Sequence, residues 1–99
     1  MKILVTGKNG QLGKSIHKVV TSKKIPYEFI FVGRQELDLS NIDSIKGFFN
    51  QNTFDIVINC AAYTDVDNAE DEYELANIVN NLAVEKIAEI AKKKHFKLI

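Results

Sequence analysis

Hydrophobic residues along the chain fall into two alternating kinds of segment. Short apolar runs, rich in β-branched and aromatic residues, are typical of strands buried on both faces of a sheet, and they cover residues 3–6, 29–32, 55–60 and 96–99. Between them, apolar residues recur at helical spacing in residues 11–21, 42–49 and 75–90. Strands that alternate with helices predict an α/β fold with a parallel sheet, right-handed crossovers and helices on both faces.

Turn and capping residues mark the ends of these segments. Gly7 ends the first apolar run and Gly33 ends the second, while Pro26 closes the region of the first helix. Ser40, followed by Asp43, predicts an N-cap with an acid at the N3 position of the second helix. Neither a linker nor a repeat interrupts the pattern, so residues 1–99 are expected to form one domain whose sheet breaks off in the strand at 96–99.

Two of the helical segments carry apolar stripes that predict which face packs on the sheet. The first stripe is formed by Leu12, Ile16, Val19 and Val20. The second is formed by Leu75, Ile78, Val79, Leu82, Ile87 and Ile90.

Composition and charge narrow the range of partners. The chain is 45% hydrophobic and 26% charged, as in soluble globular proteins, and its 13 basic and 13 acidic residues cancel. No overall field therefore favours nucleic acid or an anionic membrane. Cys60 is the single cysteine, so an intramolecular disulfide is excluded, no metal cluster is indicated, and a cytoplasmic location is expected. The acidic residues between 65 and 72 are interpreted as first-turn helix acids, not as metal ligands.

A glycine loop carries the clearest chemical signal. Gly7, Gly10 and Gly13 stand at intervals of three, directly after a strand and at the start of a helix. The first permits a tight turn, the second lets the backbone approach a pyrophosphate, and the third lets the helix pack closely. First-turn N–H groups near Gln11 and Leu12 would meet the phosphates at the positive end of the helix dipole. The loop, including Asn9, predicts dinucleotide binding of the Rossmann type.

A nucleoside triphosphate P-loop is the main competing interpretation, because Gly13-Lys14-Ser15 ends the loop as a P-loop ends. The spacing disfavours it. A P-loop requires its first glycine at the position that Lys8 occupies, and Gly7 stands one residue too early.

The end of the second strand indicates which dinucleotide is preferred. NAD-selective domains usually place Asp or Glu there to bind the ribose 2′-hydroxyl, whereas this chain has Val32-Gly33-Arg34. An arginine can pair with a 2′-phosphate through its bidentate fork. NADP(H) is therefore the expected cofactor, with NAD(H) as the alternative, and a solvated loop cation is the plain interpretation of Arg34.

Three stretches together resemble the dTDP-4-dehydrorhamnose reductases: residues 2–13, Leu37-Asp38-Leu39 and residues 59–70. These are extended short-chain dehydrogenases that reduce a nucleotide-linked 4-keto sugar with NAD(P)H. The most specific element is the turn Ala61-Ala62-Tyr63-Thr64 with the Val-Asp and Ala-Glu pairs after it. The resemblance runs the length of the chain.

The resemblance implies a role for particular residues. Gly10, Gln11 and Leu12 match the family's pyrophosphate contacts, and Asp38 with Leu39 matches its pair at the adenine. The nicotinamide half and its surroundings are matched by Ala61, Ala62, Tyr63, Thr64 and, on the last helix, Asn80.

The family's catalytic Ser/Thr, Tyr and Lys, and its sugar-binding region, are expected beyond the strand that begins at Phe96. Tyr27, Tyr63 and Tyr73 each lack a lysine four residues later. We therefore expect no catalytic residue in these 99 residues and no turnover by this chain alone.

Three hypotheses follow. The leading one is the N-terminal cofactor-binding part of an NADPH-preferring reductase, which converts dTDP-4-dehydrorhamnose to dTDP-L-rhamnose in cell-surface polysaccharide biosynthesis, with a homodimer as one allowed assembly. The second is a nucleotide-sugar epimerase or dehydratase of the same extended family. The third is a non-catalytic, NADP-binding regulatory subunit.

Overall fold

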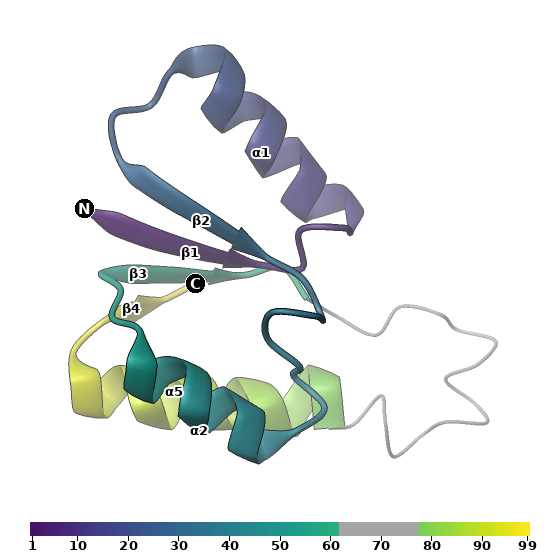
Figure 1. Ribbon diagram of the computed structural model, residues 1–99, viewed down its shortest axis with the longest axis vertical. Helices are drawn as coiled ribbons and strands as arrows, with labels where there is room; N and C mark the ends of the chain where they lie inside the picture. The colour runs from purple at the N-terminus through teal and green to yellow at the C-terminus, as the bar shows by residue number, and fades with distance from the viewer. Residues whose placement is uncertain (62–77) are drawn as a thin grey trace, which may run out of the picture.

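A single parallel sheet organises the molecule. The computed structural model describes residues 1–61 and 78–99. Its sheet has the strand order β2-β1-β3-β4 (Figure 1), and the strands are β1 (Lys2–Thr6), β2 (Glu28–Val32), β3 (Ile56–Asn59) and β4 (Lys97–Leu98). The predicted α/β class with a parallel sheet is confirmed.

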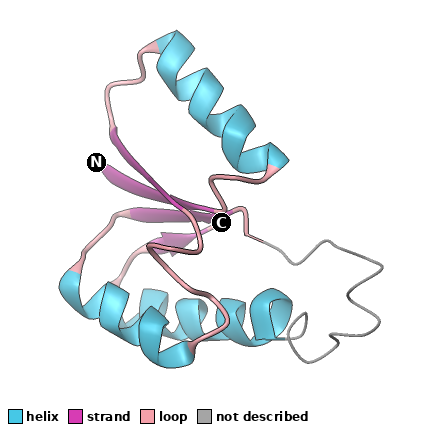
Figure 2. Cartoon of the chain, turned by 45° about the vertical axis from the view of Figure 1, so that its right-hand side comes forward, coloured by secondary structure: helices cyan, strands magenta, loops and turns pink. Residues whose placement is uncertain are grey.

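Helices cover both faces of the sheet. Helix α1 (Gln11–Lys23) lies on one face, whereas α2 (Ile42–Gln51) and α5 (Ala83–Lys94) lie side by side on the other (Figures 1 and 2). This arrangement follows from right-handed crossovers, because the chain moves outward from β1 to β2 and then returns past β1 to β3. The fold is thus doubly wound, and the strand order reverses direction between β1 and β3.

The strand register brings three strand ends to one place. Thr6 at the end of β1 lies between Val32 at the end of β2 and Asn59 at the end of β3. In doubly wound sheets, ligands bind outside the carboxyl ends of the strands at the point where the strand order reverses. By this rule, a binding crevice is expected at these three residues.

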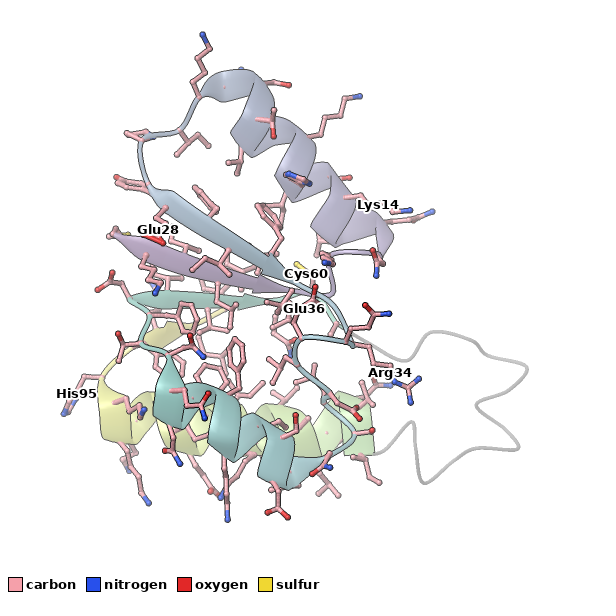
Figure 3. The ribbon with its side chains drawn as sticks, viewed as in Figure 1. Lys14, Glu28, Arg34, Glu36, Cys60 and His95 are labelled. Carbon is pink, nitrogen blue, oxygen red and sulfur yellow. The ribbon has the colours of Figure 1, made fainter. Side chains whose placement is uncertain are left out.

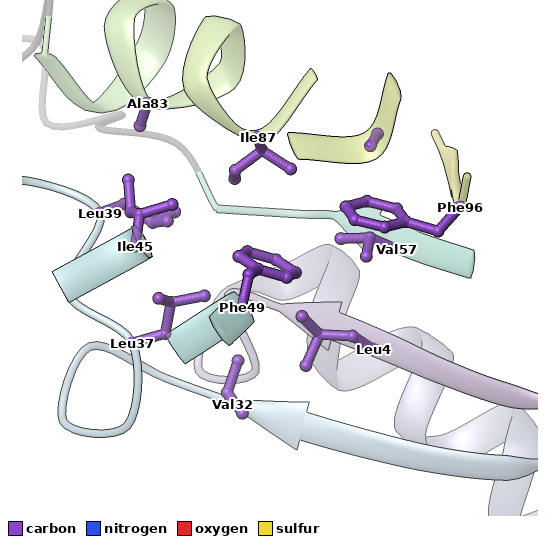
Figure 4. Packing of buried hydrophobic residues seen from close by; sticks show 11 residues of the cluster. Leu4, Val32, Leu37, Leu39, Ile45, Phe49, Val57, Ala83, Ile87 and Phe96 are labelled. Atoms are coloured by element: carbon purple, nitrogen blue, oxygen red, sulfur yellow. The ribbon is translucent and has the colours of Figure 1, made fainter. Parts of the chain in front are cut away.

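The hydrophobic core lies between the sheet and the pair α2 and α5 (Figure 4). Phe49 is 1% exposed, and its ring stacks on that of Phe96 with the ring centroids 5.4 Å apart. The Lys94 ammonium donates a hydrogen bond to the Phe49 carbonyl and joins the ends of the two helices. Four further large side chains of this core are fully buried: Leu4, Ile45, Val57 and Ile87.

The face covered by α1 is less closed than the sequence pattern predicted. Leu12 is 60% exposed and Val19 49% exposed, so the expected stripe is not a buried one, and Gly13 is the buried residue of α1. Strand β2 is likewise half-buried, because it forms an edge of the sheet. A continuous apolar run does not distinguish an edge strand from a central one, and the expectation of a fully buried second strand was wrong.

The apolar stripe predicted for the last helix is confirmed at Ile87, which is buried, and at Ile90, which packs against the core, but it fails at Leu82. Residues Ile78–Leu82 form a π-helical turn, η1, that leads directly into α5. A π turn holds more residues than an α turn, so a constant helical period drifts off the buried face there. Leu82 is 42% exposed, and the buried face of α5 is formed by Ala83, Ile87 and Ala91. Leu75 lies outside the described residues.

The N-cap of α2 differs by one residue from the prediction. Asn41, not Ser40, is the N-cap, and its Oδ1 accepts a hydrogen bond of 3.2 Å from the Ser44 N–H. Ser40 is instead held by Asp38, whose Oδ1 accepts bonds from the Ser40 hydroxyl and N–H. Serine and asparagine are both good N-caps, and the competing bond to Asp38 decides between them.

Candidate functional site

A cavity of about 260 Å³ opens where β1, β2 and β3 end. It is built mainly from the loops after these strands, and Val79 of η1 also contributes to its wall. Its described lining residues are Thr6, Gly7, Asn9, Gly10, Val32, Gly33, Arg34, Leu37, Asp38, Leu39, Ser40, Cys60, Ala61 and Val79.

Two glycines of the loop are required by the protein's own packing. Gly7 adopts φ +70°, and a Cβ there would come within 2.7 Å of the Ala61 nitrogen. A Cβ on Gly13 would come within 2.2 Å of the Gly7 carbonyl oxygen. The tight turn and the close helix packing expected for these positions are therefore both present.

Gly10 is different, because no such crowding surrounds it. An added Cβ would have only the Gly7 carbonyl oxygen within 4 Å, at an ordinary contact distance of 3.5 Å. Its backbone is extended and suits other residues (φ −81°, ψ 170°). Within the described residues, neither space nor backbone geometry demands glycine at this position, and the bare backbone of Gly10 lines the cavity.

The N-terminus of α1 is left open at the same point. Its N-cap is Gly10, no side chain caps it, and no acidic residue lies in its first turn. The first-turn N–H groups of a helix have no intrahelical acceptor and carry the positive end of the dipole. An anion at this end of the cavity would meet these donors.

Asp38 and Arg34 lie on the opposite wall, which belongs to the loop after β2. The Ser40 hydroxyl and N–H, bound to Asp38 at 2.6 and 3.0 Å, lower the pKa of that carboxyl, and Arg34 adds to the effect. Arg34 is exposed, and Figure 3 shows it on the loop between β2 and α2. This wall therefore combines an ionised carboxylate with an accessible guanidinium.

A carboxylate also lies at the tip of β2, where the sequence interpretation found none. Glu36 Oε2 accepts a 2.9 Å bond from the Gly33 N–H, and Oε1 lies 2.5 Å from the Lys8 ammonium. These contacts, led by the one to Lys8, hold the pKa of Glu36 below its ordinary value. The prediction overlooked Glu36 because it considered only the strand's last residues, whereas Glu36 reaches the tip by folding back from the next turn.

The loop after β3 is fixed by Asn59. Its Oδ1 accepts bonds from the Thr6 hydroxyl at 2.6 Å and from the Ala61 N–H at 3.3 Å. Thr6 is 1% exposed, and the bond gives its buried hydroxyl a partner. The neighbouring Cys60 is half-buried at the cavity wall, and desolvation raises the pKa of its thiol, which does not favour a nucleophile.

The structure brings half of the predicted site residues to the cavity wall, on both sides of the crevice: Gly7, Asn9, Gly10, Arg34, Asp38, Leu39 and Ala61. Gln11 and Leu12 are exposed at the start of α1, and neither residue lines the cavity. Gly13 packs against the loop, and Asn80 lies on η1 next to Val79. Ala62, Tyr63 and Thr64 lie outside the described residues, as does the acidic stretch at 65–72.

The described parts of the chain also bear on a P-loop, a metal site and a membrane-spanning helix. Lys14, which the P-loop interpretation requires at the phosphates, does not line the cavity. Within residues 1–61 and 78–99, no three His, Cys, Asp or Glu side chains lie close enough to hold a metal ion. None of the helices described is long and apolar enough to cross a membrane.

Comparison with known proteins identifies the family. The family model of the RmlD substrate binding domain matches residues 1–99. A dTDP-4-dehydrorhamnose reductase of Aggregatibacter actinomycetemcomitans is 38% identical over 90 residues, which are 91% of this chain and 30% of that protein.

Comparison with solved structures indicates the same family. The crystal structure of a dTDP-4-dehydrorhamnose reductase from Clostridium acetobutylicum superimposes with a TM-score of 0.87 and 40% identity over 99% of this chain and 34% of its own. The Bacillus anthracis reductase, in complex with NADP, gives a TM-score of 0.84 and 32% identity over 98% and 34%. The chain thus spans about a third of the relatives' length. Over its whole length, residues 1–99, the chain belongs to the RmlD substrate binding domain family.

Proposed function

We propose that residues 1–99 are the NAD(P)-binding part of a reductase that acts on a dTDP-linked 4-keto-6-deoxy sugar, dTDP-4-dehydrorhamnose. Gly10 is the observation that carries this proposal. Nothing in the described protein requires glycine there, yet its bare backbone faces a cavity beside an uncapped helix N-terminus. Family membership and the names of the relatives support the reaction class.

The residues present fit a dinucleotide. Its pyrophosphate would lie on the Gly7–Gly13 loop, against the N–H groups of Gln11 and Leu12. Leu39 and Asp38 would flank the adenine, on the wall opposite the loop. The cavity is near the lower end of the ~300–1,000 Å³ typical of small-molecule sites, so its described part suits one half of a dinucleotide. Ala61 marks the start of the other half, to which residues 62–64 and Asn80 are assigned.

The bound dinucleotide would supply the hydride for carbonyl reduction, and this chain would bind and orient it. Protonation of the sugar oxygen requires a positioned acid, worth about 10²- to 10⁴-fold in rate. The carboxylates of Glu36 and Asp38 are held ionised by their donors, so neither suits that task. The acid and the sugar-binding surface are therefore assigned to residues outside this chain.

Measuring NADPH oxidation tests whether the catalytic acid lies outside this chain. The 99-residue chain, mixed with NADPH and dTDP-4-dehydrorhamnose, is expected to leave the absorbance of the reduced nicotinamide unchanged. A longer product that includes a downstream Tyr-x-x-x-Lys pair is expected to consume it. Steady consumption by the short chain would place the acid within these residues, and Tyr63 would be examined first.

NADP(H) is proposed as the preferred cofactor, with NAD(H) second. Arg34 supports this choice, because its exposed guanidinium lies on the wall where the ribose of the adenosine half is expected. The NADP complex of the Bacillus anthracis relative agrees with it. A cytoplasmic location, supported by the single cysteine, and assembly as a homodimer stay predictions.

Titration of both cofactors by calorimetry tests the preference. NADPH is expected to bind more tightly than NADH, and Arg34→Asp is expected to reverse the order, since one charge-assisted pair contributes roughly 1.5–3 kcal/mol. Arg34→Gln is the matched variant that removes the charge without adding an opposing one, and it is expected to bring the two affinities together. Equal curves for both cofactors in all three proteins would remove Arg34 from the site.

A further inference from the structure

Two hydrogen-bond donors converge at the tip of β2, and both donate to the carboxylate of Glu36. Gly33 offers its backbone N–H from the strand end, and Lys8 offers its ammonium from the glycine loop. The carboxylate of Glu36 bridges them at 2.9 and 2.5 Å. Side chains lie close around Gly33, because a Cβ there would come within 3.2 Å of Asn9 Nδ2 and 3.3 Å of Lys8 Cε.

These donors are of the kind that bind a phosphate monoester. A lysine ammonium and a backbone N–H each form charge-assisted hydrogen bonds to phosphate oxygens. Gly33 and the exposed Arg34, next to it in sequence, both line the cavity. Lys8 and Glu36 do not themselves line the cavity, but Glu36 contacts Gly33, which does. Without the carboxylate, this edge of the cavity would present donors and positive charge only.

The carboxylate is held loosely enough to be displaced. The side chains of Lys8 and Glu36 are 35% and 41% exposed, and ion pairs so open to solvent contribute little to folding stability. The lowered pKa of Glu36 keeps it charged at neutral pH. An arriving phosphate would therefore meet both a competitor for its donors and a like charge.

We propose that Glu36 is a specificity-determining residue, whose carboxylate competes with the 2′-phosphate of the cofactor for Lys8 and the Gly33 N–H and so limits the preference for the phosphorylated dinucleotide. This inference rests on the proposed function, because the phosphate in question is that of the bound cofactor. Arg34 favours the 2′-phosphate and Glu36 opposes it, and the balance between them sets the ratio of the two affinities.

Binding of two adenosine fragments to the expressed protein tests the proposal. Adenosine 2′,5′-bisphosphate and adenosine 5′-monophosphate differ only by the 2′-phosphate. Glu36→Gln is expected to raise the affinity for the bisphosphate about tenfold, as for one charge-assisted bond regained, and to leave the monophosphate within about twofold. Glu28→Gln is the matched control, since it removes the same charge from the opposite end of β2 (Figure 3), and it is expected to change neither.

Lys8→Met completes a double-mutant cycle. With Lys8 absent, Glu36→Gln is expected to gain clearly less affinity for the bisphosphate than it gains in the unaltered protein, because one contested donor is gone. A lower bisphosphate affinity in Glu36→Gln, equal changes for both nucleotides, or gains that are independent of Lys8 would overturn the inference while the proposed function stands. If the unaltered protein bound neither nucleotide, the proposed function would fall and the inference with it.

Discussion

Helices α1 and α2, which follow neighbouring strands, begin in opposite ways. The N-terminus of α2 is completed by its own residues, because Asn41 accepts from the Ser44 N–H and Asp43 lies in the first turn. The N-terminus of α1 has a glycine cap, no side-chain acceptor and no acid, and Gly10 at this end lines the cavity. Both helices have the same unpaired N–H groups to satisfy. The chain supplies a side-chain acceptor at the start of α2 and none at the start of α1, which leaves that end open to the proposed ligand.

The two ends should therefore respond differently to substitution. Changes at the start of α1 are expected to alter ligand binding more than folding, and changes at the start of α2 are expected to do the reverse. The first two experiments below test this contrast, and the third sharpens it at the turn before α2; they run from the largest expected effect to the smallest.

Gly10→Val is expected to weaken NADPH binding by at least about 100-fold, or roughly 2.7 kcal/mol, because a branched side chain would occupy the space of the pyrophosphate. The cost in folding stability should be modest, since even a Cβ finds only one neighbour, at 3.5 Å. Calorimetry measures the first quantity and urea unfolding the second. Normal NADPH binding by a folded variant would contradict the phosphate assignment.

Asn41→Ala is expected to lower the free energy of unfolding by about 1 kcal/mol, as the loss of an N-cap usually does. NADPH affinity should stay unchanged, because Asn41 does not line the cavity. Asn41→Ser restores a capping oxygen and should recover most of the stability in urea unfolding. If Asn41→Ala instead lowered NADPH affinity strongly and left stability normal, the two helix starts would not differ as proposed.

The turn before α2 should show a small dependence on pH. The pKa of Asp38 is lowered in the folded chain by its bonds to Ser40, so its contribution to stability is complete above the unfolded pKa of about 3.9 and is lost as the pH falls through the lower folded value. The unfolding free energies of the unaltered chain and of Asp38→Asn should therefore differ by a constant amount from pH 7 to about 5 and converge below about pH 4. A difference that persists at the lowest pH would show that the bonds to Ser40 do not depend on the charge.

Local chemistry explains which features the sequence predicted. The strands, the glycine loop and the parallel topology follow from short apolar runs, from glycine spacing and from the alternation of strands with helices, all of which are local signals. Gly7 and Gly13 carry the geometry expected of them. The cavity wall also includes Arg34 and Asp38, as the strand-end rule and the family resemblance indicated.

The missed features depend on contacts that a local pattern does not contain. Lys8 and Glu36 are 28 residues apart and meet only because β1 and β2 are neighbours. Ser40 was a sound N-cap by type, but Asp38 binds its hydroxyl. Leu82 is exposed because of the π turn η1, and no residue type in the sequence predicts such a turn. Half-burial of β2 follows from its position at the sheet edge.

Gly13 is the only fully buried residue of α1, and Ile16 and Val20 are half-buried, so this helix buries less apolar surface than the helices on the other face. Elements with few buried contacts open at lower free energy than the core, and a ligand that binds only the closed form stabilises it by mass action. An anion on the first-turn N–H groups would thus act as a tether. The bound anion would hold α1 against the sheet, as the buried side chains of Phe49 and Ile87 hold α2 and α5.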